Sequence, residues 1–544
     1  MKTTDAINDW ISTADRFFEA GDPNGARACA HEILDLDKRS AHGWALLAEC
    51  ELYLGLLEAA EAHAHEALEI DADNLRARLV IGGIAAERFE LDIELPTLRS
   101  VIDRARQRSD QKILFKALVW LSNGLYLAGE PDGAADCLSE ASTLNAERAI
   151  ELYGKHLFYR NYRRTSNRDE AIRFQKFFDG IAPLDLPSTK QHKKVRIGYV
   201  SPDFRLHAVA HFVEPLIKNF DGDRFQVYCY QTTEGDEVTR RLKKHNVRWR
   251  ELIDETPLES ARRIAADGID LLIDLSGHSQ NSCLPILAYK PAPVQMTALG
   301  YVATTGLKAV DYFLSDEYSS PPPNDFTETL MRMSDCHLCY APKVVKVMPA
   351  VSTVEHEHIT FGSFNNFAKV SDRVLELWKA ILDGVEGSRL IIKAKTCSIP
   401  SGRSIIVRRL SDVGIEPARV ELRSFSPDYL EQYADVDIAL DTFPYNGGLT
   451  TCEALYMGVP VIALKGRTHG DRIGASLLHS ARIDELIAST ADEYINKAIE
   501  LAIDPERLKH YRMTLRSSME RSPLMDQKLY MKNFETILKR LFGK

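Results

Sequence analysis

The 544-residue sequence lacks the features that mark membrane, secreted or nucleic-acid-binding proteins. No apolar run approaches the ~20 residues that a membrane-spanning helix needs. The first residues carry no apolar segment of the kind found in signal peptides. Basic residues are in the minority, and a net charge of −10 argues against nucleic acid as the main ligand. We therefore expect a cytoplasmic protein, because 45% apolar and 27% charged residues are typical of soluble globular domains.

Paired cysteines and clustered metal ligands are also scarce. The nine cysteines are scattered singly except for Cys336 and Cys339, and one such pair alone more often reflects two buried thiols than a metal or redox site. Asp435 and Asp437 have the D-x-D spacing with which some sugar-nucleotide enzymes of another fold hold Mg²⁺ or Mn²⁺. Here the pair comes at the beginning of a predicted strand, the end away from a ligand site. The sequence therefore predicts a site with no metal and no cofactor.

Residues 1–146 are predicted to form helical repeats. The segment 30–37 recurs with small changes at 64–71, and a third related stretch covers 129–145. A period of about 34 residues with a glycine in the turn is typical of tetratricopeptide helix pairs. The register of residues 75–112 stays open. Such an array either binds peptide or protein in its groove or only packs on the rest of the chain, and the sequence supports both. Residues 147–190 are expected to form a helical connector.

After the connector, predicted strands and helices alternate in two series. The apolar strands are expected at 195–201, 225–230, 247–252 and 269–275, and then at 359–364, 389–394, 420–425, 436–440 and 461–464. Alternation of this kind indicates mostly parallel sheets with helices on both faces. We expect an α/β protein of two Rossmann-like lobes, residues 191–345 and 346–544. Glycosyltransferases of the GT-B type have this architecture, but epimerases and some binding proteins share it.

The most distinctive stretch is a glycine-rich turn at 441–448, between a predicted strand and a predicted helix. Gly447 and Gly448 let the backbone approach a ligand, and Thr450 and Thr451 place hydroxyl and amide groups at the helix start. A helix N-terminus favours an anion, and doubly wound sheets bind ligands at the carboxyl ends of their strands. The turn therefore predicts a phosphate site, with an ordinary N-cap as the alternative.

Three further strand ends carry side chains that could take part in chemistry. His207 follows the first strand of the first lobe, His278 follows the strand at 269–275, and Lys369 follows the first strand of the second lobe. A histidine titrates near neutrality and can act as acid or base, while a lysine can neutralise a diphosphate. Structural hydrogen bonding for the histidines and a solvated surface position for the lysine are the alternatives.

Together and in this order, these segments resemble the O-linked N-acetylglucosamine (O-GlcNAc) transferase family, including its bacterial members and the SPINDLY-type proteins. The matching stretches are 198–207, 274–278, 290–295, 361–369 and 441–460. The resemblance implies a GT-B fold and an inverting, metal-independent protein O-glycosyltransferase. In that reaction N-acetylglucosamine moves from UDP-N-acetylglucosamine (UDP-GlcNAc) to serine or threonine hydroxyls of proteins.

The resemblance also assigns residues to the nucleotide sugar. Lys369 resembles the lysine that binds the diphosphate, and Asn366 lies where relatives carry Gln or Asn near the nucleotide sugar. Thr450 and Thr451 match the phosphate-binding helix start. Glu453 matches the acidic residue that faces the ribose.

Among the histidines, His207 matches an active-site histidine whose role as base the resemblance leaves open. His278 is the second candidate, so that His207, Lys369 and His278 form the predicted catalytic set. The partners implied are a nucleotide-sugar donor and a protein acceptor, which the tetratricopeptide groove could recruit. The resemblance gives no role to nucleic acid or to a membrane.

Two departures from the family pattern concern specificity. Many relatives read Gly-Tyr-Pro-Gly-Thr where this chain has 300–304 as Gly-Tyr-Val-Ala-Thr, and many place a histidine against the nucleobase where this chain has Tyr429. Stacking on the base is retained in principle, but the hydrogen bond differs. The same chemistry with GDP-fucose or UDP-glucose is therefore an alternative, and so is a catalytically inactive tetratricopeptide interaction protein.

Overall fold

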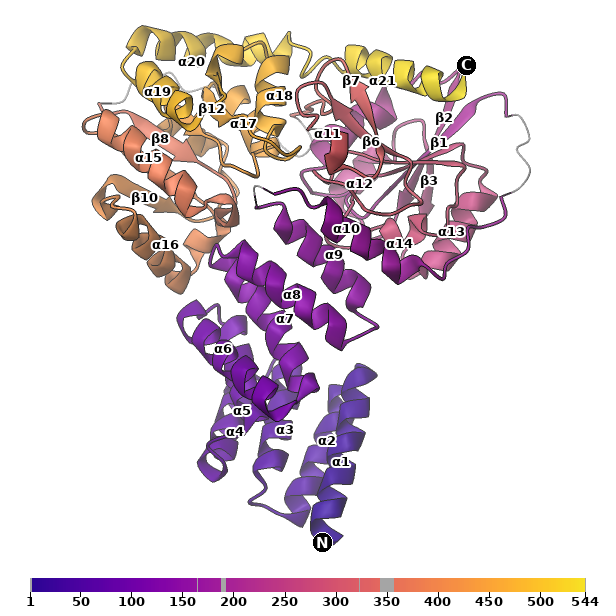
Figure 1. Ribbon diagram of the computed structural model, residues 1–544, viewed down its shortest axis with the longest axis vertical. Helices are drawn as coiled ribbons and strands as arrows, with labels where there is room; N and C mark the ends of the chain where they lie inside the picture. The colour runs from indigo at the N-terminus through magenta and orange to yellow at the C-terminus, as the bar shows by residue number, and fades with distance from the viewer. Residues whose placement is uncertain (1, 164, 187–191, 322, 343–356, 544) are drawn as a thin grey trace. The chain divides into compact units, whose positions relative to one another are not determined.

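A computed structural model describes residues 2–163, 165–186, 192–321, 323–342 and 357–543 (Figure 1). Its contacts divide the chain into two compact units. One comprises Met1–Leu152 with Ile399–Ile406, and the other comprises Tyr153–Ser398 with Val407–Lys544. None of the helices in the described ranges is long and apolar enough to cross a membrane.

The first unit is an all-helical, tetratricopeptide-like array in which each helix packs on the next. Its helices are α1 (Lys2–Glu19), α2 (Pro23–Leu36), α3 (Ala41–Tyr53), α4 (Leu57–Ile70), α5 (Leu75–Glu87), α6 (Leu91–Arg108), α7 (Gln111–Leu127) and α8 (Pro131–Leu144). Buried alanines such as Ala30, Ala64 and Ala134 let neighbouring helices approach closely. The helical repeats expected from the sequence are therefore confirmed.

The turn inside each helix pair explains both the repeat and its interruption. Gly21, Gly55 and Gly129 have φ values of 72°, 75° and 80°, a left-handed conformation that glycine adopts at no steric cost. At the equivalent turn between α5 and α6, Phe89 takes the same conformation with φ of 56°. The register of residues 75–112 was hidden in the sequence because its marker glycine is replaced by phenylalanine.

The connector begins with α9 (Ala149–Arg160) and α10 (Arg168–Phe174). The first lobe then forms a seven-stranded parallel sheet in the order β3-β2-β1-β4-β5-β6-β7. Its strands are β1 (Val195–Ser201), β2 (Phe225–Gln231), β3 (Arg248–Glu251), β4 (Leu271–Asp274), β5 (Val294–Thr297), β6 (Tyr312–Asp316) and β7 (Thr329–Met333). The helices between them are α11 (Ala210–Lys218), α12 (Glu237–Leu242), α13 (Pro257–Ala266) and α14 (Leu284–Leu287).

The second lobe repeats this topology in a six-stranded parallel sheet, in the order β10-β9-β8-β11-β12-β13. Its strands are β8 (Thr360–Ser363), β9 (Arg389–Lys393), β10 (Val420–Arg423), β11 (Ile438–Leu440), β12 (Val461–Leu464) and β13 (Ile487–Ala488). Its helices are α15 (Asp372–Gly384), α16 (Pro400–Asp412), α17 (Leu449–Tyr456), α18 (Ile473–Ser480), α19 (Ala491–Ala502) and α20 (Pro505–Glu520). Both sheets have the strand order of a Rossmann fold, so the predicted two-lobed α/β class is confirmed.

The last helix, α21 (Gln527–Phe542), contributes to the core of the first lobe. Its apolar face, including Tyr530, Phe534 and Ile537, belongs to the same buried cluster as Val195 and Ile197 of β1. Figure 1 shows this yellow helix beside β7 and α11, whose residues it contacts. The chain therefore returns to the first lobe after completing the second. The predicted limits at 191–345 and 346–544 stay predictions.

Candidate functional site

The candidate site residues follow the strands at which each sheet reverses its order. In the first lobe the reversal lies between β1 and β4, which precede His207 and His278. In the second lobe it lies between β8 and β11, which precede Lys369 and the turn at 441–448. Ligands of doubly wound sheets bind at this point, outside the carboxyl ends of the strands.

Lys369 is held at the centre of the second lobe's reversal. Its Nζ donates a hydrogen bond to the Asn446 carbonyl at 2.8 Å and lies 4.4 Å from the centre of the Tyr445 ring. Burial lowers the pKa of Lys369 to about 8, and the nearby Asp441 carboxylate opposes that shift. The connector also contacts this group, because Tyr162 stacks on Tyr445 with ring centres 5.1 Å apart. The structure thus brings the predicted lysine and the predicted glycine-rich turn together.

Asp441 is a buried carboxylate that the sequence reading did not single out as a site residue. Its Oδ1 accepts the Gly447 amide at 2.7 Å and the Thr442 amide at 2.9 Å. Its buried Oδ2 has no hydrogen-bond partner among the described residues. Burial raises the pKa of Asp441, while the Gly447 amide and Lys369 favour the charged form. The available signal was its position, the first residue after β11.

The start of α17 is open to an anion. No side chain of the described residues caps its first turn, which follows Gly448. The Thr450 hydroxyl donates to Asn365 Oδ1 at 3.1 Å, and the Thr451 hydroxyl donates to the Gly447 carbonyl at 3.1 Å. A Cβ at Gly447 would lie 2.6 Å from both threonine hydroxyls, so a larger residue there would have to displace them. Amide groups of the first helical turn lack partners within the helix and can bind phosphate oxygens.

An aromatic and acidic group lies beside this helix. The Tyr429 hydroxyl donates a short hydrogen bond to Glu453, whose pKa is raised to about 7 by burial although that hydrogen bond lowers it. Tyr433 stacks on Phe364 with ring centres 4.4 Å apart, and its hydroxyl donates to the Thr450 carbonyl at 3.3 Å. Tyr429, predicted to contact the base, and Glu453, predicted to face the ribose, are thus hydrogen-bonded to each other.

Asn366 lies three residues before Lys369 on the loop that follows β8. Its side chain is exposed, and its Oδ1 accepts the Ala368 amide at 3.1 Å, which begins the short turn through Lys369. Asn366 thus begins the turn that carries Lys369, and its contact with the nucleotide sugar stays a prediction.

His207 is exposed on the loop after β1. Its Nδ1 accepts the Val209 amide at 3.3 Å and lies 3.6 Å from Asp203 Oδ2. Burial raises the pKa of Asp203, whereas a charged His207 would lower it. With Nδ1 turned to its own loop, the Nε2 side of the ring faces away from these contacts and can meet a substrate.

His278 lies in a different environment and is only 1% exposed. Its Nε2 lies 2.8 Å from the Thr305 carbonyl, and the Phe174 and Tyr301 rings stand edge-on at 4.5 and 5.2 Å. Burial lowers its pKa to about 4. A neutral, enclosed ring of this kind is suited to packing between the connector and the first lobe, which argues against its predicted role as reserve base.

Candidate metal ligands give a further result. Asp435 and Asp437 precede β11, as predicted. Asp435 accepts a hydrogen bond from Arg423 at 2.7 Å, and Asp437 accepts one from the Thr360 amide at 2.8 Å. Cys336 and Cys339 are buried free thiols, as expected.

Within the described ranges, one group has ligand atoms within 4.8 Å of one another, namely Asp316, Cys336 and His337. Both oxygens of Asp316 already accept hydrogen bonds, Oδ1 from the Tyr318 and Ser319 amides and Oδ2 from His337 Nδ1 at 2.6 Å. The group therefore works as a hydrogen-bond centre, and a metal would have to displace these donors.

The fold and the site together define a two-lobed protein of the GT-B class. The family model Glycosyl transferase family 41 matches residues 181–344 and 342–534, and the chain belongs to this family. The structure is similar to that of a mutant O-GlcNAc transferase from Thermobaculum terrenum, with a TM-score of 0.73 and 28% identity. That similarity covers 99% of this chain and 98% of the other.

Curated relatives match a smaller part. The protein named "Probable UDP-N-acetylglucosamine--peptide N-acetylglucosaminyltransferase SPINDLY" from Solanum lycopersicum is 38% identical over 391 residues, which cover 69% of this chain and 42% of that protein. Its counterpart from Arabidopsis thaliana is 38% identical over 394 residues, covering 70% and 43%. The matched part of the chain thus spans less than half the length of these relatives.

Proposed function

We propose that the protein is an inverting, metal-independent glycosyltransferase that moves N-acetylglucosamine from UDP-GlcNAc to serine and threonine hydroxyls of proteins. The observation that carries this proposal is the position of Lys369 against the glycine-rich turn and the open start of α17. A lysine ammonium and a helix N-terminus together can balance a diphosphate without a metal ion. Membership of the family and the likeness to the bacterial O-GlcNAc transferase support the same activity.

In this proposal the donor lies across the second lobe. The diphosphate binds between Lys369 and the first turn of α17, and the ribose and base lie toward Glu453 and Tyr429. The acceptor oxygen forms a bond to the anomeric carbon as the bond to the phosphate oxygen breaks. The electron pair of that broken bond leaves with UDP, so negative charge grows beside Lys369 in the transition state. Preorganised positive groups act most strongly at such a point.

The acceptor hydroxyl needs a group that holds it in line or accepts its proton, and His207 is the proposed group. It lies on the loop after β1, at the reversal of the first sheet, and its ring is exposed. The Val209 amide bonded to Nδ1 favours the tautomer with the proton on Nε2. In that tautomer, Nε2–H can donate a hydrogen bond to the acceptor hydroxyl and hold it in line. To act as a general base, Nε2 would have to lack its proton. The proposal therefore gives His207 a site role and leaves orienting or base action to kinetics.

Which nucleotide sugar binds depends on Tyr429, whose hydroxyl is already hydrogen-bonded within the protein. Because the Tyr429 hydroxyl is used by Glu453, Tyr429 can offer its ring to a base but has no proton left to donate. Recognition of uracil then depends on other groups, and guanine is the natural competitor. Thermal-shift measurements with UDP-GlcNAc, UDP-glucose and GDP-fucose test this choice, since a ligand at one hundred times its dissociation constant stabilises by about 2.7 kcal/mol.

We expect UDP-GlcNAc to give the largest shift, and Lys369→Ala to remove most of it. Lys379→Ala is the matched control, because Lys379 lies on the same lobe and pairs with Asp383 on α15. A larger shift with GDP-fucose would identify GDP-fucose as the donor in place of UDP-GlcNAc. No shift with any of the three would favour an inactive interaction protein.

A further inference from the structure

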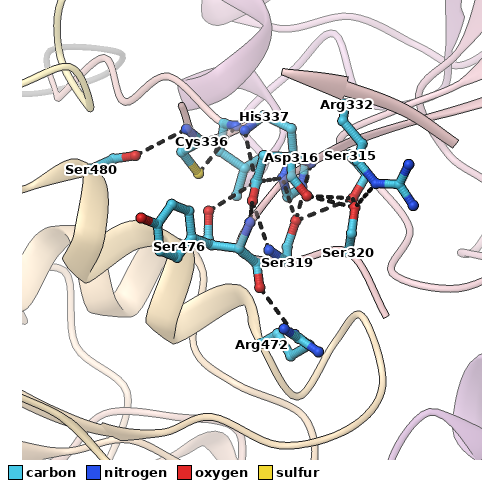
Figure 2. A network of polar contacts seen from close by, with 12 residues as sticks. Ser315, Asp316, Ser319, Ser320, Arg332, Cys336, His337, Arg472, Ser476 and Ser480 are labelled. Atoms are coloured by element: carbon cyan, nitrogen blue, oxygen red, sulfur yellow. Dashed lines mark hydrogen bonds and ion pairs between the residues drawn. The ribbon is translucent and has the colours of Figure 1, made fainter. Parts of the chain in front are cut away.

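A buried carboxylate of the first lobe accepts a hydrogen bond from the second lobe, and residues beside it make two more such contacts. Asp316 ends β6 and is 0% exposed. From its own lobe, its Oδ1 accepts the amides of Tyr318 and Ser319, and its Oδ2 accepts the amide of His337 at 3.0 Å and lies 2.6 Å from the Nδ1 of that residue. Figure 2 shows Ser319 and His337 beside Asp316. A carboxylate with this many donors is charged and fixed in place.

The remaining contacts of this centre reach α18 of the second lobe. The Ser476 hydroxyl donates to Asp316 Oδ2 at 2.8 Å. One residue before the helix, Arg472 Nε donates to the Tyr318 carbonyl at 3.0 Å, and at the end of the helix the Cys336 amide donates to Ser480 Oγ at 2.9 Å (Figure 2). The first lobe therefore binds α18 near its beginning, in its middle and at its end.

The first turn of α18 in turn packs on the groups around Lys369. The Gly474 amide donates to Asn446 Oδ1 at 3.1 Å, and the Asn446 carbonyl accepts Lys369 Nζ at 2.8 Å. A Cβ at Gly474 would lie 2.5 Å from Asp441 Oδ2, so the helix start also lies directly against the carboxylate that faces the lysine. Ser476 is only two residues further along the helix.

We propose that Asp316 is a positioning residue for the donor diphosphate, acting from the first lobe through Ser476 and the start of α18 on Asn446 and hence on Lys369. This inference rests on the proposed function, since it assumes that Lys369 binds a diphosphate. The carboxylate fixes Ser476, and Ser476 fixes the first turn of α18. The Gly474 amide of that turn then holds the side chain of Asn446, whose backbone carbonyl accepts the Lys369 amine. The alternative is that the same contacts only hold the two lobes together.

The two alternatives differ in which ligand loses affinity. Ser476→Ala removes one hydrogen bond to Asp316, while the other donors to that carboxylate remain. We expect it to weaken UDP binding about three- to tenfold, the range expected for the loss of one hydrogen bond. Binding of uridine, which has no phosphate, should stay within about twofold. Ser480→Ala is the matched control, because it removes another contact between the lobes from the same helix at the end away from Gly474.

A double-mutant cycle tests the route through the lysine. In a Lys369→Ala background, Ser476→Ala should change UDP affinity by less than about twofold, since the group that it positions is gone. Asp316→Asn should reproduce the selective loss of UDP affinity at a temperature where circular dichroism shows the variant folded.

Four results would overturn the inference, and three of them would point to packing. Equal losses for UDP and uridine, equal losses in the Ser476 and Ser480 variants, or full additivity with Lys369→Ala would each show a role in packing alone. A wild-type protein that binds no UDP would instead remove the proposed function on which the inference rests. Wild-type binding that Lys369→Ala weakens and Ser476→Ala leaves unchanged would keep the function and reject the positioning role.

Discussion

The substitution Lys369→Ala tests the proposed diphosphate site. It removes an amine that donates to Asn446 at 2.8 Å and lies over the ring of Tyr445. The shortened side chain leaves the Asn446 carbonyl without that donor and leaves Asp441 without its neighbouring positive charge. Both groups would then face the diphosphate without compensation.

The size of the effect follows from the charges. Two unit charges 4 Å apart interact by about 4 kcal/mol at the effective dielectric constant of 20 that suits a partly buried site. The amine of Lys369 already interacts with Asn446 and Asp441, so only part of this is gained when a diphosphate binds. Loss of one preorganised transition-state donor costs about 2.7–4 kcal/mol in enzymes, which is a rate factor of about 10²–10³. We therefore expect kcat to fall by that factor.

The assay is steady-state transfer to a protein acceptor, with kcat and the donor KM determined separately. Because charge grows on the leaving UDP, kcat should fall more than donor affinity does. Lys369→Arg should retain part of the activity, since it keeps the charge but is larger and planar. Lys379→Ala on α15 should behave as wild type. A Lys369→Ala variant within threefold of wild type would exclude Lys369 from the site.

Four further predictions concern pH, the two histidines and metal. Burial lowers the pKa of Lys369 to about 8, so UDP affinity should fall as pH rises through that value. Lys369→Arg should abolish this fall. An unchanged pH dependence in the variant would assign the titration to another group. His207→Ala should lower the rate by about 10²–10⁴ at unchanged donor affinity if His207 is the base, and should weaken donor binding too if it orients the sugar; a variant normal in both would make it structural. His278→Ala should lower the melting temperature and leave the activity per folded molecule nearly unchanged. A variant with an unchanged melting temperature and a large loss of activity would restore His278 as a candidate base. Transfer should continue in excess EDTA, whereas loss and recovery with Mg²⁺ or Mn²⁺ would show that a metal acts in the site.

Much of the fold could be predicted because most strands are continuous apolar runs. The predicted strands at 195–201 and 461–464 coincide with β1 and β12. By contrast, β7 is a half-exposed edge strand and β13 has only two residues, so neither stands out from the surrounding sequence. The helix pair of α5 and α6 lost its register because Phe89 takes the left-handed turn that glycine takes elsewhere in the array.

The candidate site was only partly predictable, for a physical reason. Glycines, threonines and a lysine next to strand ends can be recognised locally, and the topology brings these strand ends together. Burial and pairing depend on distant segments. His278 is enclosed by Phe174 of the connector, and Asp316 meets Ser476, which lies 160 positions further along the chain. Contacts over such separations leave no local pattern.

The central claim is tested most directly by incubating the protein with UDP-GlcNAc and protein acceptors and mapping the products by mass spectrometry. The proposal predicts N-acetylglucosamine on serine or threonine side chains, released UDP, and inversion at the anomeric carbon. Wild-type protein and Lys369→Ala should differ by about 10²–10³ in product formed. Transfer of another sugar, modification of a different side chain, or no transfer from a folded protein that binds UDP would contradict the account.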